Sequence, residues 1–169
     1  MLQESSRSFT IRPALPSDAS QICAIYNPYI AHSHITFEEE PVGADTMAER
    51  IEAILPVLPW LVWEQRQEIG GYAYASRWKE RASYRHSVES TIYLRRDAMG
   101  RGVGTQLYTA LLEALRGRGL HAVIGGIALP NEASVALHEK LGFVKSALFH
   151  QVGRKFDRWI DVGYWQRLL

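Results

Sequence analysis

The stretch from Tyr93 to Tyr108 decides the fold, and it reads Y-L-R-R-D-A-M-G-R-G-V-G-T-Q-L-Y. It leads from a strand-like segment into an amphipathic helix, with Gly100, Gly102 and Gly104 at alternate positions between the two. Glycine leaves the backbone N–H groups uncovered and accepts a positive φ. The following helix adds the positive end of its dipole, so the turn is suited to bind an anion such as a pyrophosphate.

Two better-known phosphate motifs do not match this turn. A Walker loop needs Lys followed by Ser or Thr after its last glycine, where this chain has Thr105 and Gln106. A dinucleotide fingerprint counted from Gly102 and Gly104 needs a third glycine where Leu107 stands. Taken alone, the three glycines fit a plain tight turn before a helix equally well, so a function must be argued from the rest of the chain.

Outward from the turn, the spacing of apolar residues predicts one domain over residues 1–169, with 1–8 as a flexible tail. Strands are expected near 9–12, 60–63, 69–75, 87–94, 121–127, 143–152 and 159–168, and helices near 22–29, 47–54, 104–117 and 131–141. The strand–helix–strand order across the glycine turn makes one parallel crossover. We therefore expect an α/β fold with a central twisted, mostly antiparallel mixed sheet and helices on both faces.

The composition is that of an ordinary globular protein without a marked charge. The 19 Lys and Arg residues nearly balance the 18 Asp and Glu residues, which does not favour a nucleic-acid partner. Cys23 is the only cysteine, so an intrachain disulfide is excluded and a reducing, cytoplasmic location fits best. No apolar run approaches the ~20 residues of a membrane span, and no His or carboxylate spacing is typical of a metal site.

Two landmarks identify the chain as resembling the GNAT superfamily of N-acetyltransferases. The segment from Met99 to Gly104 is similar to the motif Gln/Arg-x-x-Gly-x-Gly/Ala, although Met99 departs from the usual Gln or Arg. The segment N-E-A-S at 131–134, continuing to L-G-F at 141–143, matches the second landmark. The resemblance implies the GNAT fold and acetyl-CoA as cosubstrate. It implies contacts with acetyl-CoA from Ile92, Tyr93, Leu94, Met99, Gly100, Arg101, Gly102, Val103, Gly104, Thr105, Gln106, Asn131 and Ser134. A valine in place of Gly104 is expected to lie against the pyrophosphate.

Over nearly its whole length the chain resembles one branch, the phosphinothricin and methionine sulfoximine N-acetyltransferases. The matching pieces are Y-N at 26–27, W-K-E-R at 78–81, V-E-S-T-I-Y at 88–93, L-H-E-K-L-G-F at 137–143 and V-G-R-K-F at 152–156. The motif W-K-E-R at 78–81 is more like the phosphinothricin enzymes, and R-H at 85–86 is more like the sulfoximine enzymes. The resemblance also implies a homodimer in which the C-terminal strands, residues 152–165, help close the partner's pocket.

Glu89 is the candidate general base. Strand alternation places Glu89, Thr91 and Tyr93 on one face, with Val88 and Ile92 on the other. Glutamate is depleted in strand interiors, and such a break in local preference often marks a functional position. An acceptor amine must lose a proton before it attacks a thioester, and a half-buried carboxylate can take that proton. An edge-facing or ion-paired glutamate is the alternative.

His138 is the second catalytic candidate. Asn131, Ser134 and His138 are three and four residues apart and share one helix face. A lone helical histidine is more often structural. Most GNAT enzymes carry a tyrosine here as general acid for the leaving thiolate, and the resemblance implies that His138 either protonates the sulfur or hydrogen-bonds the substrate or cofactor.

Cationic residues precede the Glu89 strand. Lys79, Arg81 and Arg85 lie close together, and a solvated positive loop is the simplest interpretation. Glutamate analogues carry a carboxylate and a second acid-like head, which suit the forked donors of arginine. We therefore expect Arg81 and Lys79 to bind the substrate, with Tyr84 and Thr91 completing the pocket.

The resulting hypothesis is an acyltransferase that moves the acetyl group of acetyl-CoA directly to the α-amine of a small glutamate-like amino-acid analogue. Two alternatives stay open. One is acetylation of a protein N-terminus or lysine, and the other is a CoA-binding module without catalysis. Arg81 beside Glu89 argues against the first, because a peptide N-terminal residue has no free α-carboxylate, and Glu89 with His138 argues against the second.

Overall fold

The computed structural model describes residues 8–169, so most of the expected tail at 1–8 lies outside the described residues. The strands are β1 (Thr10–Pro13), β2 (Trp60–Gln65), β3 (Glu68–Arg77), β4 (Ser87–Leu94), β5 (Ala122–Ala128), β6 (Val144–Lys155) and β7 (Arg158–Leu168). The helices are α1 (Ala19–His32), α2 (Ala44–Ile54), α3 (Val103–Gly117) and α4 (Glu132–Lys140), with short 3-10 turns η1 (Pro16–Asp18), η2 (Ala82–Tyr84) and η3 (Arg96–Ala98). This order confirms the predicted succession of elements.

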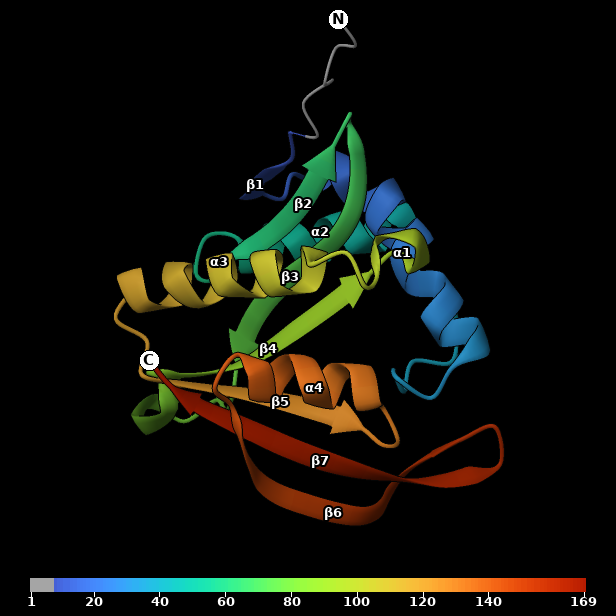
Figure 1. Cartoon of the computed structure of the whole chain (residues 1–169), viewed down its shortest axis with the longest axis vertical. Coiled ribbons are helices and arrows are strands. Elements are labelled where there is room, and N and C mark those ends of the chain that lie inside the picture. The colour runs from blue at the N-terminus through green and yellow to red at the C-terminus, as the bar shows by residue number, and fades with distance from the viewer. Residues whose placement is uncertain (1–7) are drawn as a thin grey trace, which may run out of the picture.

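The strands form one mixed sheet in the order β1-β2-β3-β4-β5-β7-β6 (Figure 1). β4 and β5 pair in parallel, and the other neighbouring strands described here pair antiparallel. The parallel pair arises because α3 crosses between them, as the glycine turn predicted. The expected mixed sheet with one parallel crossover is therefore confirmed.

Helices cover both faces of the sheet, and each face has its own core (Figure 1). On one face, α3 buries Leu107, Leu111 and Leu115 completely against β3 to β5 and α4 adds Leu137. On the other face, α1 and α2 pack apolar residues at helical spacing against β2 and β3. In residues 8–169, no helix is long and apolar enough to span a membrane.

β4 and β5 separate after a short stretch of pairing (Figure 1). Their ladder consists of Ser87 with Ala122, Val88 with Val123 and Glu89 with Ile124. β4 then continues to Leu94 and β5 to Ala128, beyond the last residues of the ladder. The facing edges of 90–94 and 125–128 therefore lie at an opening in the middle of the sheet, with its vertex at Glu89.

Candidate functional site

The glycine turn begins where β4 ends and leads through η3 into α3. Gly100 has φ +69° and Gly102 has φ +82°, and Gly102 is the N-cap of α3 in the left-handed conformation. These angles disfavour any residue with a Cβ. A Cβ built on either glycine meets no atom within 4 Å, so the outer side of the turn is open. The turn thus presents the uncapped start of α3 to an anion.

Gly104 plays a different part from the one the sequence predicted. It is buried in the first turn of α3, and a Cβ added there would lie 3.2 Å from a methyl carbon of Leu94 and 3.3 Å from one of Leu137. Its missing side chain lets α3 approach β4 and α4. The expectation that a valine here meets a pyrophosphate is wrong, because the added atoms point into the protein core.

Both α3 and α4 begin beyond the carboxyl ends of the two diverging parallel strands (Figure 1). Asn131 caps α4, since its Oδ1 accepts a hydrogen bond of 3.2 Å from the backbone N–H of Ser134. The Lys140 ammonium donates to Thr105 Oγ1 at 3.4 Å and adds a positive charge beside the start of α3. In parallel α/β sheets, ligands bind at such a point outside the carboxyl ends of the strands.

Other residues of the expected cofactor set have varied surroundings. The Gln106 side chain accepts a hydrogen bond from Trp63 Nε1 at 3.0 Å, and Met99 is 45% exposed. Ile92 and Leu94 pack on the α3 side of β4, whereas the Tyr93 ring packs edge-on and tilted against Tyr26 and Tyr29 of α1 on the opposite face.

Glu89 occupies the last paired position of β4, at the vertex of the opening. Its carboxylate lies on the α1–α2 face, where a Cβ added to Gly126 would be 3.1 Å from Glu89 Oε1 and 3.1 Å from the ring of Tyr164. Burial raises the pKa of the Glu89 carboxyl above its ordinary value, and the nearby charge of Lys79 opposes that rise. A raised pKa brings a carboxylate closer to the range in which it accepts and releases protons at neutral pH.

His138 lies on the other face of β5 and is only 3% exposed. Its ring sits against Gly125, where a Cβ would collide with Nε2. Nδ1 is 2.7 Å from the Ser134 carbonyl oxygen, and Nε2 is 3.0 Å from the Tyr108 hydroxyl. Burial lowers the pKa of the imidazole, and the hydrogen bond to the Ser134 carbonyl opposes this in part. Adjacent glycines in β5 therefore bring Glu89 and His138 close to the strand from opposite sides.

The expected substrate residues divide into two groups. Lys79 acts on the Glu89 carboxylate and places its ammonium 4.9 Å from the centre of the Trp78 ring, while Thr91 lies opposite Tyr74 in the β3–β4 ladder. Arg81 and Tyr84 are exposed on the segment between β3 and β4. The structure brings the first pair toward the vertex and leaves the second pair exposed on the segment that precedes β4.

Sequence reasoning missed four residues that shape the vertex: Ser90, Tyr108, Gly125 and Gly126. The two glycines carried a usable signal, because glycine inside a strand often marks a close approach by another group. Ser90 and Tyr108 carried none, since their contact joins residues from β4 and α3 that only the tertiary fold brings together.

Comparisons with known proteins agree with this architecture. Over residues 11–163, the chain matches the family described as the acetyltransferase (GNAT) domain. It is 39% identical to the phosphinothricin N-acetyltransferase of Streptomyces viridochromogenes, over 95% of this chain and 88% of that protein. It is 36% identical to the L-methionine sulfoximine/L-methionine sulfone acetyltransferase of Pseudomonas aeruginosa, over 94% of each.

A solved structure extends the likeness to three dimensions. The phosphinothricin acetyltransferase from Sinorhizobium meliloti, in complex with acetyl-CoA, matches with a TM-score of 0.91 and 35% identity. The match covers 95% of this chain and 88% of that one.

We expect Gly102→Val to weaken the binding of acetyl-CoA at least tenfold while the protein stays folded. Valine at φ +82° is strained by about 1–3 kcal/mol, so the turn must rearrange. Isothermal titration calorimetry measures the affinity. Gly117→Val is the matched control, because Gly117 ends the same helix, has a negative φ and has open space around a Cβ. Equal affinity in the two variants would contradict the assigned turn.

We expect Lys79→Met to raise the pKa of Glu89 further, because it removes the charge that opposes the effect of burial. Carbon-13 NMR titration of the Glu89 carboxyl measures this pKa without any substrate. Lys79→Arg keeps the positive charge and should leave the titration near that of the wild type. An unchanged or lower pKa in the methionine variant would show that Lys79 does not act on Glu89.

Proposed function

This chain belongs to the GNAT acetyltransferase family, and from that premise we propose that it transfers acetyl from acetyl-CoA directly to the α-amine of a small, glutamate-like amino-acid analogue. It is an N-acetyltransferase of the acyltransferase class. The observation that carries the proposal is the half-buried Glu89 carboxylate at the vertex where β4 and β5 separate. At this position the Glu89 carboxylate can take a proton from an acceptor amine that is bound in the opening.

The opening fits an extended cosubstrate that carries amide groups. The edges of 90–94 and 125–128 face each other without a ladder between them, and strand edges accept backbone-like hydrogen bonds from a ligand. We assign the arm of acetyl-CoA to this opening, along Ile92, Tyr93 and Leu94. We assign its pyrophosphate to the turn from Met99 to Gln106, beside Asn131 and Ser134 of α4. Acetyl-CoA supplies an activated acetyl thioester at the vertex.

Glu89 removes the proton that prevents the acceptor amine from attacking. Amino groups of this kind titrate at ~7.7–8.0 or above, so most are protonated at neutral pH. The Glu89 carboxylate takes one proton, directly or through one water, and the neutral amine then has a free electron pair. The raised pKa of Glu89 brings the base and the amine closer in proton affinity, which eases the transfer.

In this proposal His138 hydrogen-bonds to the Ser134 carbonyl and the Tyr108 hydroxyl, and it is not the proton donor to the sulfur of CoA. The Ser134 carbonyl can only accept, so Nδ1 of His138 carries a proton and donates it to that carbonyl. In the neutral ring, Nε2 then has no proton to give. Burial keeps the ring neutral by lowering its pKa.

The acceptor class is inferred from charge and from relatives. The relatives at 36–39% identity act, by their names, on phosphinothricin and on methionine sulfoximine or sulfone. Such analogues carry an α-carboxylate and a second oxygen-bearing head, for which this chain offers Lys79 near Glu89 and Arg81 on the exposed segment before β4. Tyr84 and Thr91 complete the proposed pocket. A cytoplasmic location and the absence of a metal stay predictions.

Replacing Glu89 by glutamine keeps the side-chain shape and removes the base. We expect kcat for Glu89→Gln to fall by the ~10²–10⁴ that is usual for a lost general base, with the affinity for acetyl-CoA little changed. The loss should shrink at high pH, where the amine deprotonates without help. Release of the CoA thiol measures the rate. A variant as active as the wild type at neutral pH would remove Glu89 from the mechanism.

The choice of acceptor is tested by the same thiol-release assay over a panel of amines. We expect phosphinothricin or methionine sulfoximine to be acetylated far faster than glutamate, alanine, lysine or a peptide. Arg81→Ala should raise KM for the good acceptors with a smaller effect on kcat, because a binding contact worth ~1.5–3 kcal/mol is lost. Preference for a peptide N-terminus would instead support the protein acetyltransferase, and no turnover of any amine would support the CoA-binding module.

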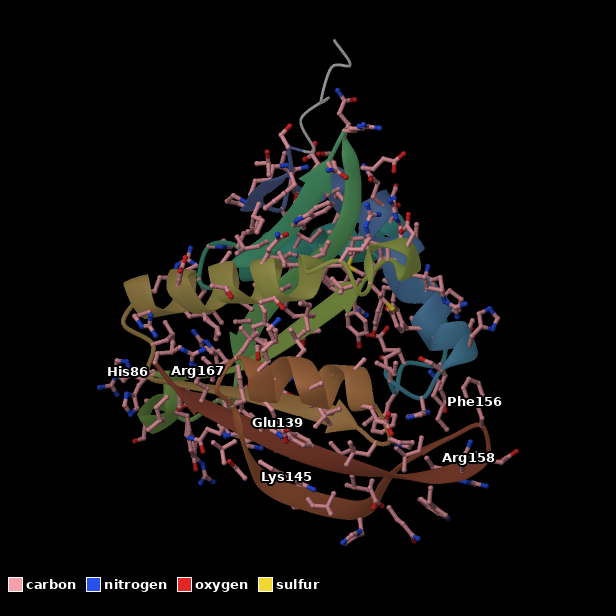
Figure 2. The ribbon with its side chains drawn as sticks, in the orientation of Figure 1. His86, Glu139, Lys145, Phe156, Arg158 and Arg167 are labelled. Carbon is pink, nitrogen blue, oxygen red and sulfur yellow. The ribbon has the colours of Figure 1, made fainter. Side chains whose placement is uncertain are left out.

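We also propose a homodimer formed through the C-terminal strands. β6 is one of the two edge strands of the sheet, and the β6–β7 hairpin exposes Val144, Phe149, Val152, Phe156 and Trp159. Figure 2 shows Phe156 and Arg158 at the tip of this hairpin. Exposed apolar and aromatic residues on a sheet edge are typical of an interface.

Light scattering at micromolar concentration should report a dimer for the wild type. Trp159→Glu places a charge in the proposed interface and should shift the equilibrium toward the monomer, while Trp63→Glu, on β2 far along the sheet order, should not. A monomeric wild type would refute the proposed dimer.

A further inference from the structure

A buried chain of hydrogen bonds joins β4, α3 and α4 behind the vertex. Ser90 Oγ is 2.5 Å from the Tyr108 hydroxyl, which is 3.0 Å from Nε2 of His138, and Nδ1 of His138 is 2.7 Å from the Ser134 carbonyl. Tyr108 is fully buried, and Ser90 and His138 are nearly so. No step of the proposed transfer uses Tyr108 or Ser90. Buried polar groups nevertheless cost folding free energy unless each of them has a hydrogen-bond partner.

The donor and the acceptor in each of these hydrogen bonds follow from the Ser134 carbonyl, at one end of the series. The Ser134 carbonyl only accepts, so the proton of the neutral imidazole is on Nδ1 and Nε2 is an acceptor. The Tyr108 hydroxyl must then donate to Nε2, and the Tyr108 oxygen accepts the proton of Ser90. The hydroxyls of Ser90 and Tyr108 each donate their one hydrogen to the next group in the series. Both ring nitrogens of the Nδ1–H tautomer of His138 then have a hydrogen-bond partner.

The chain also ends at the place where the strands part. Ser90 is the first residue of β4 beyond the ladder. The hydrogen that its hydroxyl donates to Tyr108 at 2.5 Å is shared with a second, more distant acceptor, the Ile124 carbonyl oxygen of β5 at 3.3 Å, across the vertex. On the same side, the His138 ring packs edge to face with Tyr108 and Phe143 and rests on Gly125. The chain therefore supports, from the α3–α4 face, the strand positions that hold Glu89 on the other face.

We infer that Tyr108 is a positioning residue that, together with Ser90, donates a hydrogen bond to Nε2 of the Nδ1–H imidazole of His138, holds this ring in place and fixes the vertex of the β4–β5 opening. This deepens the proposed function and rests on it for the kinetic consequence. The tautomer itself is a property of the protein without substrate. Tyr108 thus acts through His138 and through the strand positions, and it need not contact the acceptor or acetyl-CoA.

Tyr108→Phe tests the inference because it removes the hydroxyl and keeps the ring. Nitrogen-15 NMR of the imidazole in the substrate-free protein should show the Nδ1–H tautomer of His138 in the wild type, with Nε2 as a hydrogen-bond acceptor. In the variant the bond from Nδ1 to Ser134 remains, and the Nε2 resonance should move toward that of an imidazole nitrogen without a hydrogen bond. In the thiol-release assay, kcat should fall tenfold or more, while KM for acetyl-CoA and for the acceptor change less than about twofold. An Nε2–H or charged imidazole in the wild type would overturn the inference, as would a variant that keeps both kcat and the wild-type Nε2 resonance.

A control separates this role from general loss of stability. Leu112 lies one turn further along α3 than Tyr108, in the same buried cluster, and Leu112→Val changes only an apolar side chain. It should lower the melting temperature without changing the His138 signal or kcat. If Tyr108→Phe does not fold, Ser90→Ala takes its place, with an expected fall in kcat of at least threefold, and an unchanged kcat would overturn the inference. If the wild type acetylates no amine, the proposed function fails while the NMR result still decides the tautomer.

Discussion

The separation of β4 from β5 after Glu89 and Ile124 is the constraint on which the rest of the molecule depends. Two parallel strands that stop pairing while both continue leave backbone N–H and C=O groups at an opening in the middle of a sheet. Such groups are costly to bury without partners, so the fold either admits water or receives a ligand there. The position of the vertex decides which side chains meet that ligand first.

The remaining elements follow from this opening. α3 crosses between the two strands, and its first turn together with the Asn131 cap of α4 lies at the carboxyl ends where the gap is widest. At the narrow end, Gly125 and Gly126 remove two side chains in succession. Because successive strand positions face opposite ways, the first glycine admits His138 on one face and the second admits the Glu89 carboxylate on the other.

Local pattern predicted what depends on local chemistry. The strand, glycine turn and helix from 93 to 108 form as expected, and the alternation of β4 places Tyr93 and Ile92 on opposite faces, as predicted, with Tyr93 toward α1 and Ile92 toward α3. Gly104 was misjudged because three glycines in one turn look alike in sequence. Only the approach of Leu94 and Leu137 distinguishes its role from that of Gly102.

The parts that escaped prediction depend on pairing between distant segments. The length of the β4–β5 ladder cannot be read from either strand alone. Tyr108 lies beside the leucine stripe of α3, and its sequence neighbours give it the look of an ordinary core residue. Its meaning comes from Ser90, 18 positions before it, and His138, 30 positions after it. The charges of Lys79 and Arg81 suggest an acidic acceptor, and the proposed amino-acid analogues come from relatives in the same family.

Hydrogen–deuterium exchange with and without acetyl-CoA tests most directly whether the opened strands are the binding site. Peptides covering 90–94 and 125–128 should both gain protection on addition of acetyl-CoA, together with the turn at 100–105, while β1 and β2 stay unchanged. Protection confined to the turn, or appearing instead on the β6–β7 hairpin with none in the two diverging strands, would contradict the account.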